Sequence, residues 1–345
     1  MPGRRQRQQL SLLQGAPVKP IRIPSARSSR GMTLVELLVA MTIGLFLIIM
    51  VVTVLISTTT SSRVSVLTAQ MNEDAALAIE LLQEQIRLSG FSGQTAGARH
   101  FTGVPLIGCD SGFTPASESG PFDQLACNPG NGADSLAVRY EGTGLNSQLV
   151  GNVPPLLPAD CTSSGVAAAD PGTGTAISLI DNRFYIENDA GNANTPSLYC
   201  RGSDGAGGFN QSSALIPNIE DLQFRYAVTR MPVAGQVMPH QVTAHVDASD
   251  PALGNVPLNW SRVAAVHICL VARSAQPVPL GDNQVVDVGG FVDCNDVVQN
   301  PMDRFVRRSY RTTVFLRNAR PAVPAAFELN GVVVQNPYRH LSSSN

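Results

Sequence analysis

The most prominent feature of the hydrophobic pattern is an uncharged apolar run of twenty residues from Leu37 to Ile56. An α-helix rises 1.5 Å per residue, so this run is long enough to cross the hydrocarbon core of a bilayer. After a polar patch at 57–62, apolar residues recur every three or four positions, which predicts an amphipathic helix. This apolar stripe consists of Val64, Leu67, Met71, Ala75, Ala78, Leu82 and Ile86.

Together the two patterns predict one helix from about Thr33 to Leu88, on the order of 80 Å long. The stretch 89–93 contains two glycines, and we expect the helix to end there. The first half is apolar on all sides, so it should lie in lipid or against other helices. The second half should pack its stripe on a sheet.

Beyond Gly93, short segments with alternating polar and apolar residues predict β-strands. No helical pattern separates them, which favours a mostly antiparallel sheet. The stretches 94–132 and 141–175 are rich in Gly, Pro and Ser, and we expect loops there. The expected strands are 135–140, 176–180, 183–187, 197–201, 221–229, 262–273 and 307–317, with one added strand at 332–334.

The charge distribution is strongly asymmetric, although the net charge of the 345 residues is only −2. Residues 1–31 hold seven cations and no acid, which leaves 17 basic and 26 acidic residues in the remainder. Cations before an apolar run keep that end cytoplasmic, so the rest of the chain should face outward. The acidic remainder argues against a general affinity for nucleic acid.

All six cysteines follow the apolar run, and none forms a C-x-x-C pair. In an exported region this pattern indicates disulfides, although free buried thiols remain an alternative. Six cysteines allow 15 connectivities, and we favour sequential pairing because it closes the shortest loops. The fold class is then α+β: a long N-terminal helix packed on a mostly antiparallel sheet head with disulfide-braced loops. The candidate disulfide residues are Cys109, Cys127, Cys161, Cys200, Cys269 and Cys294.

One carboxylate, Glu36, lies at the start of the apolar segment, where a charge is costly unless it has a partner. The surrounding Gly-Met-Thr-Leu-Val-Glu-Leu-Leu, from Gly31 to Leu38, resembles the cleavage and methylation motif of type IV prepilins and pseudopilins. The resemblance implies that a prepilin peptidase cuts after Gly31 and methylates the new amine of Met32. Met32 is a departure, because the family usually has Phe there. We expect Glu36 to pair with that amine and to set the register of assembly.

Four further motifs resemble PilW-type minor pilins: 85–91 at the helix end, the pair Cys161 and Cys200, 219–226, and 314–318. The resemblance implies a pilin-like fold held in the inner membrane as a single-pass protein with a periplasmic head, and later in the pilus at the cell surface. The implied partners are the prepilin peptidase, other minor pilins, the major pilin, the inner-membrane assembly platform and a tip adhesin. Some of these motifs recur in minor pseudopilins of type II secretion, which remain an alternative.

The predicted organisation has five parts. A basic leader at 1–31 is cleaved, 32–56 is the transmembrane or filament-core half of the helix, and 57–90 is its amphipathic half. Residues 91–318 form an extracytoplasmic β-rich head, and 319–345 form a C-terminal tail. A single-span exported receptor or binding module is the alternative from another functional class.

No catalytic motif stands out in the sequence, so we expect no enzyme, cofactor or metal. His240 and His245, with two nearby aspartates, are expected to be solvated loop residues. Acidic stretches at 181–189 and 282–287 have the ligand chemistry for calcium but lack the EF-hand pattern. The Gly-Thr-Gly pairs at 142–144 and 172–174 are expected to be turns. The six arginines between Arg304 and Arg320 are expected to form a solvated strand face.

Overall fold

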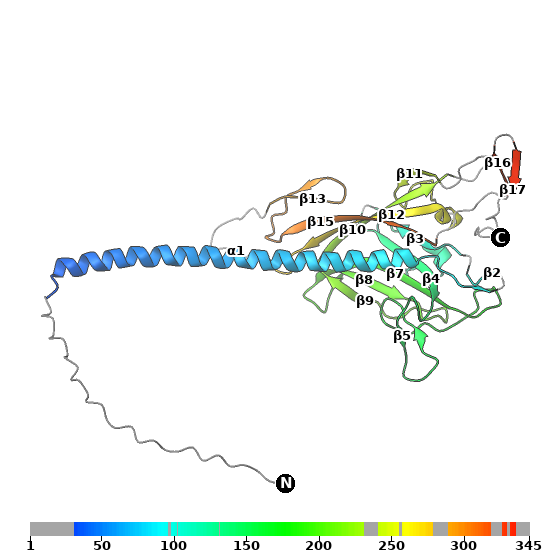
Figure 1. Ribbon diagram of the computed structural model, residues 1–345, viewed down its shortest axis with the longest axis horizontal. Helices are drawn as coiled ribbons and strands as arrows, with labels where there is room; N and C mark the ends of the chain where they lie inside the picture. Colours follow the sequence, from blue (N-terminus) through cyan, green and yellow to red (C-terminus); the bar gives the residue numbers. More distant parts are fainter. Residues whose placement is uncertain are drawn as a thin grey trace, which may run out of the picture. The chain divides into compact units, whose positions relative to one another are not determined.

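The computed structural model describes residues 31–95, 98–101, 103–130, 132–230, 241–254, 257–278, 289–318, 326–329 and 332–335. The chain divides into two compact units, Met1–Ser57 and Thr58–Asn345. One helix, α1 (Leu34–Leu88), begins in the first unit and ends in the second (Figure 1). The long helix predicted from the sequence is thus confirmed to within one residue at its start.

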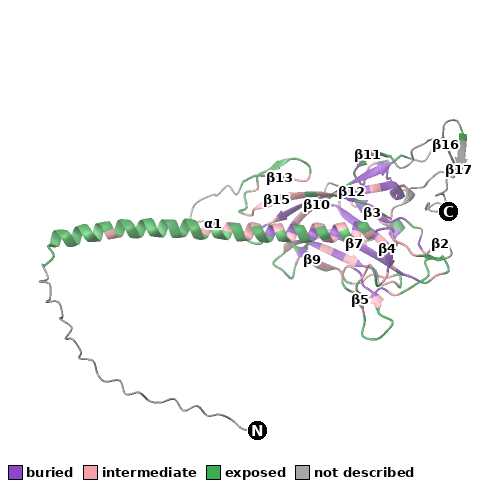
Figure 2. Cartoon of the chain, in the orientation of Figure 1, coloured by how far each residue is buried: buried purple, intermediate pink, exposed green. Residues whose placement is uncertain are grey.

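In the first unit, the described part is residues 31–33 followed by α1. Every residue from 31 to 57 except the half-buried Gly44 is exposed within the unit (Figure 2). After Glu36 the segment carries only uncharged side chains. It therefore presents an apolar surface on all sides, as the sequence predicted for a helix that lies in lipid or among other helices.

In the second unit, α1 buries one stripe of its surface in the hydrophobic core (Figure 2). Val64 and Leu67 are half-buried, and the rest of the predicted stripe is fully buried. The amphipathic period read from the sequence is therefore confirmed. The fully buried members are Met71, Ala75, Ala78, Leu82 and Ile86.

Two antiparallel sheets make up most of the head. The five-stranded sheet has the order β3-β4-β7-β8-β9, and the four-stranded sheet has the order β11-β10-β12-β15. The α+β class with a mostly antiparallel sheet is confirmed. The strands are β3 (Leu106–Cys109), β4 (Ser135–Gly142), β7 (Ser178–Asp189), β8 (Thr195–Gly202), β9 (Ser213–Pro217), β10 (Ile219–Thr229), β11 (Val242–Val246), β12 (Val263–Arg273) and β15 (Arg307–Phe315).

Four two-stranded ribbons and two 3-10 helices complete the described chain. The ribbons pair β1 (Gln94–Thr95) with β2 (Ala98–Arg99), β5 (Leu149–Val150) with β6 (Leu157–Pro158), β13 (Phe291–Val292) with β14 (Val298–Gln299), and β16 (Ala326–Leu329) with β17 (Val332–Gln335). The 3-10 helices are η1 (Phe122–Gln124) and η2 (Pro257–Arg262).

Some sequence predictions for the head are wrong in detail. The segments 176–180 and 183–187 belong to one strand, β7, which pairs with β4 over 178–184 and with β8 over 182–189. The expected loop 94–132 contains the fully buried strand β3. The strand predicted at 332–334 is confirmed as β17, which pairs with β16 in a hairpin. The leader up to residue 30 lies outside the described residues.

Two glutamines attach the helix to both sheets. Gln83 Nε2 donates a hydrogen bond of 2.8 Å to Thr312 Oγ1 on β15 of the four-stranded sheet. Gln85 Oε1 accepts hydrogen bonds from Tyr140 on β4, at 3.3 Å, and from Asn182 on β7, at 2.8 Å. The end of α1 is therefore held by directional polar contacts as well as by its apolar stripe.

The helix ends at a left-handed glycine, Gly90, with φ of +74°. This conformation is typical of helix C-termini because glycine lacks a Cβ. The side-chain amide of Asn318 donates to the carbonyl oxygens of Arg87, at 2.9 Å, and Leu88, at 3.4 Å. Two of the sequence motifs, 85–91 and 314–318, thus meet at the end of the helix.

Candidate functional site

The expected cleavage site lies just before the helix. Residues 31–33 are non-helical and exposed, and Met32 is 63% exposed. No described atom lies within 4 Å of a Cβ built on Gly31. The Gly31–Met32 peptide bond therefore lies in an exposed, non-helical segment of the first unit. A peptidase needs such access.

The helix starts with a reciprocal cap that the sequence analysis missed. Thr33 Oγ1 accepts a hydrogen bond of 3.3 Å from the backbone N–H of Glu36. The carboxylate of Glu36 accepts one of 3.3 Å from the backbone N–H of Thr33. This is a capping box, and the Thr-x-x-Glu spacing that signals it was present in the sequence. Glu36 thus has a local structural role in the uncleaved chain.

The apolar segment of α1 is long and apolar enough to cross a membrane, judged by length and composition. It follows the capping box directly, because Leu37 is the first residue of the uncharged run. A segment of this length and composition is a candidate membrane anchor. Cleavage after Gly31 would leave both the capping box and the apolar run on the mature chain.

Three disulfides join the six cysteines in sequential order, as favoured from the sequence. Cys109–Cys127 closes a loop at the end of β3, and Cys161–Cys200 ties a loop to β8. Cys269–Cys294 ties the β13–β14 ribbon to β12. Each bridge joins a strand of one of the two sheets to a segment outside both sheets.

A fully buried arginine, Arg183 on β7, organises the loop after β3. Its guanidinium donates to both carboxylate oxygens of Asp181, at 3.1 and 2.8 Å. It also donates to the backbone carbonyls of Ser117, Glu118 and Gly120, at 2.7 to 3.1 Å. All its donors are therefore satisfied inside the protein, which a buried charge requires. Arg183 belongs to the framework of the head.

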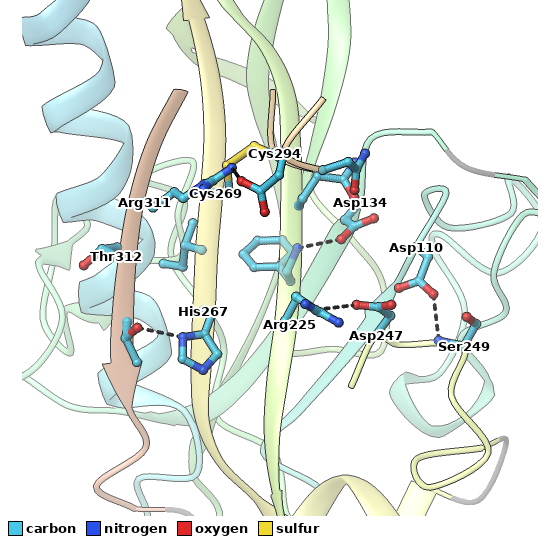
Figure 3. A pocket seen from close by; sticks show the side chains of 16 residues that line it. Asp110, Asp134, Arg225, Asp247, Ser249, His267, Cys269, Cys294, Arg311 and Thr312 are labelled. Atoms are coloured by element: carbon cyan, nitrogen blue, oxygen red, sulfur yellow. Dashed lines mark hydrogen bonds and ion pairs between the residues drawn. A yellow bond between two sulfur atoms is a disulfide. The ribbon is translucent and has the colours of Figure 1, made fainter. Parts of the chain in front are cut away.

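A polar cleft of about 730 Å³ lies over the four-stranded sheet (Figure 3). Asp247 accepts a hydrogen bond of 3.0 Å from Arg225, and Asp110 accepts hydrogen bonds from the backbone N–H groups of Ala248 and Ser249. Figure 3 shows the Cys269–Cys294 disulfide beside this cleft. Because acidic and basic side chains share the lining, the cleft has no uniform charge.

Asp134 is the most perturbed acid of this cleft. Only 3% of the residue is exposed, and burial raises the pKa of Asp134 to about 8. The hydrogen bond from the backbone N–H of Phe224, at 2.6 Å, acts in the opposite direction. Asp110 lies near enough to raise the pKa further. Asp134 is therefore partly protonated near neutral pH.

The structure revises the expected position of one histidine and of one acidic stretch. His245 lies in β11, which corrects the prediction of a loop, and its ring meets that of His267. His240 and the acidic stretch 282–287 lie outside the described residues. The other acidic stretch, 181–189, is part of a strand and does not form a calcium loop. Within the described residues, no three His, Cys, Asp or Glu side chains gather as a metal site.

The arginine-rich end of the chain is only partly a solvated face. Arg307 is nearly buried and forms ion pairs with Glu220 and Asp303. Arg311 is half exposed and forms an ion pair of 2.7 Å with Asp296. These contacts neutralise the two arginines within the head. They weaken the case for an anionic partner at this strand.

Two parts of the chain match models of known protein families. A model of the type IV pilus-assembly protein W family, PilW, matches residues 183–318. A model of the prokaryotic N-terminal methylation motif matches residues 26–52, which contain Gly31, Met32 and Glu36. No curated protein sequence matches the chain. Among solved structures, a type IV-like pilin from Thermus thermophilus is similar over 72% of this chain and 97% of its own, with 12% identity and a TM-score of 0.32.

Proposed function

Because the chain is a type IV prepilin-like protein of the PilW type, we propose that it is a minor pilin that primes or caps assembly of a type IV pilus with other minor pilins. Twitching motility, adhesion and DNA uptake are the processes it would serve. In this role the chain contributes surfaces for assembly and performs no catalysis of its own. Its partners are the prepilin peptidase, other pilins, the assembly platform and a tip adhesin.

The observation that carries the proposal is the order of features at the amino terminus. An exposed Gly31–Met32 bond is followed at once by a capped helix start and then by the uncharged run from Leu37. Cleavage at that bond yields a mature chain whose helix begins at its third residue, Leu34. Such a helix can leave the bilayer only by exchanging lipid contacts for contacts with other apolar helices.

Glu36 has two roles in this proposal. Before cleavage it caps the helix through Thr33. After cleavage Met32 carries an ammonium one residue before Thr33, and Glu36 offers the opposite charge. An unpaired charge among packed apolar helices is penalised, so only registers that pair the two charges are favoured.

The first experiment tests processing. We expect Gly31→Ala to block cleavage. A Cβ at this position has no described atom within 4 Å beyond the neighbouring residues, so the change should not disturb the fold. Any loss of processing would then arise at the peptidase. The matched control is Met32→Phe, which keeps an apolar residue after the scissile bond and should be processed normally. Mass spectrometry of the amino terminus in cells with active peptidase gives the readout. A mature, N-methylated terminus in Gly31→Ala would contradict the proposed site.

A second experiment separates the two roles of Glu36. Gln can replace Glu in a capping box but carries no charge. If the charge sets register, Glu36→Gln and Glu36→Ala should both be cleaved and both be depleted from sheared pili. If only the cap matters, Glu36→Gln should incorporate like the parent chain, and the register mechanism is wrong. For each variant, an immunoblot compares the amount of the chain in sheared pili with the amount in the membrane fraction.

The type II secretion alternative predicts the same processing but a different machine. Deletion of the gene should then abolish secretion of exported enzymes and leave piliation intact. A single-span receptor predicts an intact leader or cleavage at another bond. The mature mass therefore separates the receptor from both pilin-like alternatives.

A further inference from the structure

Two histidine rings meet on the exposed face of the four-stranded sheet. His245 lies on β11 and His267 on β12, and β10 runs between these strands. His245 Nδ1 is nevertheless 2.8 Å from His267 Nε2, and the ring centroids are 4.7 Å apart. Ala227 on β10 is the register partner of His245 on one side and of Ala265 on β12 on the other. These two small side chains leave the space in which the rings meet.

The contacts of His267 fit a tautomer that carries its hydrogen on Nδ1. His267 Nδ1 lies 2.7 Å from Thr313 Oγ1 on β15, a contact drawn in Figure 3. A neutral imidazole has one N–H, so donation from Nδ1 to the threonine leaves Nε2 with its lone pair. That lone pair faces His245, which is exposed to solvent. A single hydrogen then lies between the two facing nitrogens.

We propose that His245 and His267 form a binding site for a divalent transition-metal ion of the Zn²⁺ or Cu²⁺ type. Neutral imidazole nitrogens are common ligands of both ions. The ion would replace the hydrogen between the rings, and the hydrogen would move to the other nitrogen of His245. The facing nitrogens need to separate from 2.8 Å to about 3.3 Å, the spacing of two tetrahedral ligands about 2.0–2.1 Å from zinc.

The surroundings of the pair support this use. Thr313 holds the other ring nitrogen of His267, and an oxygen partner of this kind orients metal-binding histidines. Burial, then His245 and Arg225, lower the pKa of His267, which favours the neutral form of the ring. The adjacent cleft leaves room for further ligands.

The protein supplies only part of the coordination shell. Among the described residues, no third His, Cys, Asp or Glu completes a ligand group. Water or a group from another molecule would fill the remaining positions, so the ion should exchange readily. Arg225 opposes a bound cation, although its ion pair with Asp247, at 3.0 Å, reduces that effect.

The test uses the full chain, purified in detergent and freed of metal, with Zn²⁺ added in a calorimetric titration. We expect one Zn²⁺ per chain, and we expect His245→Ala and His267→Ala each to weaken binding at least tenfold. His100→Ala is the matched control, because His100 pairs with Glu141 away from this sheet, and it should leave the affinity unchanged. Thermal unfolding of each variant shows that the fold persists.

A second arm tests the electrostatics of the site. Arg225→Gln removes the opposing cation and frees Asp247, so it should tighten Zn²⁺ binding several-fold if the ion sits beside His267. The proposal is overturned if the parent chain does not bind Zn²⁺, or if the two histidine variants bind it as tightly as the parent. It is also overturned if Arg225→Gln leaves the affinity unchanged. None of these outcomes depends on whether the chain enters a pilus.

Discussion

Replacement of the buried arginine on β7, Arg183→Met, is the sharpest test of how the head holds its loops. Met keeps the apolar stem and removes the charge. The change leaves Asp181 with only the longer contact of 3.5 Å to Arg139, and it leaves three loop carbonyls without their donor. Breaking a buried pair on one side costs about 3–5 kcal/mol, because an uncompensated charge remains.

A control with the same charge change is available on the next strand. Arg201 is the direct partner of Arg183 in the register of β7 and β8, and it contacts the same loop through Ser119 and Glu118. Its side chain is a quarter exposed, and its ion pair is 3.6 Å long. Such pairs contribute about 0–1 kcal/mol, so Arg201→Met should be nearly silent.

The assay is urea unfolding of the oxidised chain, followed by near-ultraviolet circular dichroism. The loss of about 3–5 kcal/mol is read directly as the difference in the free energy of unfolding between the variant and the parent chain. The Cys109–Cys127 loop should also become sensitive to limited proteolysis in Arg183→Met only. Equal losses in the two variants, or a loss below about 1 kcal/mol for Arg183→Met, would refute the reasoning.

Three further predictions follow from the head. Burial raises the pKa of Asp134 in the folded state, so the folded chain binds more protons than the unfolded chain and stability should fall as pH rises from about 4 to about 8; Asp134→Asn should flatten that slope in unfolding curves measured at several pH values. Replacing Cys161 and Cys200 by Ser opens a loop of 39 residues and should cost about 4 kcal/mol in the same unfolding assay. Gln85→Ala leaves two donors in the core unpartnered and should cost more than 2 kcal/mol, whereas Gln83→Ala loses one half-buried bond and should cost about 1 kcal/mol.

The parts of the fold that the sequence predicted are those governed by local periodicity. The helix and its stripe follow from a period near 3.6 that is repeated over many turns, so one misplaced residue does not change the result. The strand 262–273 was equally clear, because it is a continuous β-prone run that becomes the central strand β12. Sequential disulfides followed from the short loops that they close.

The features that the sequence did not predict depend on partners far along the chain. β7 was divided in two because the polar residues Asp181 and Asn182 interrupt its alternation. Their burial is explained by their partners, Arg183 for Asp181 and the distant Gln85 on α1 for Asn182. The meeting of His245 with His267 has no local signal, because another strand lies between them. The cap by Glu36 does have a local signal, the Thr-x-x-Glu spacing from Thr33 to Glu36.

The contact between Asn318 and the end of α1 has a consequence for the order in which the molecule is completed. Asn318 follows Leu88 by 230 residues, yet it donates to the last carbonyls of the helix. A chain synthesised from its amino terminus contains the whole of α1 long before this residue is added. The final turn can therefore be capped only when nearly the whole head is present, so the junction between helix and head distinguishes a finished chain from a truncated one.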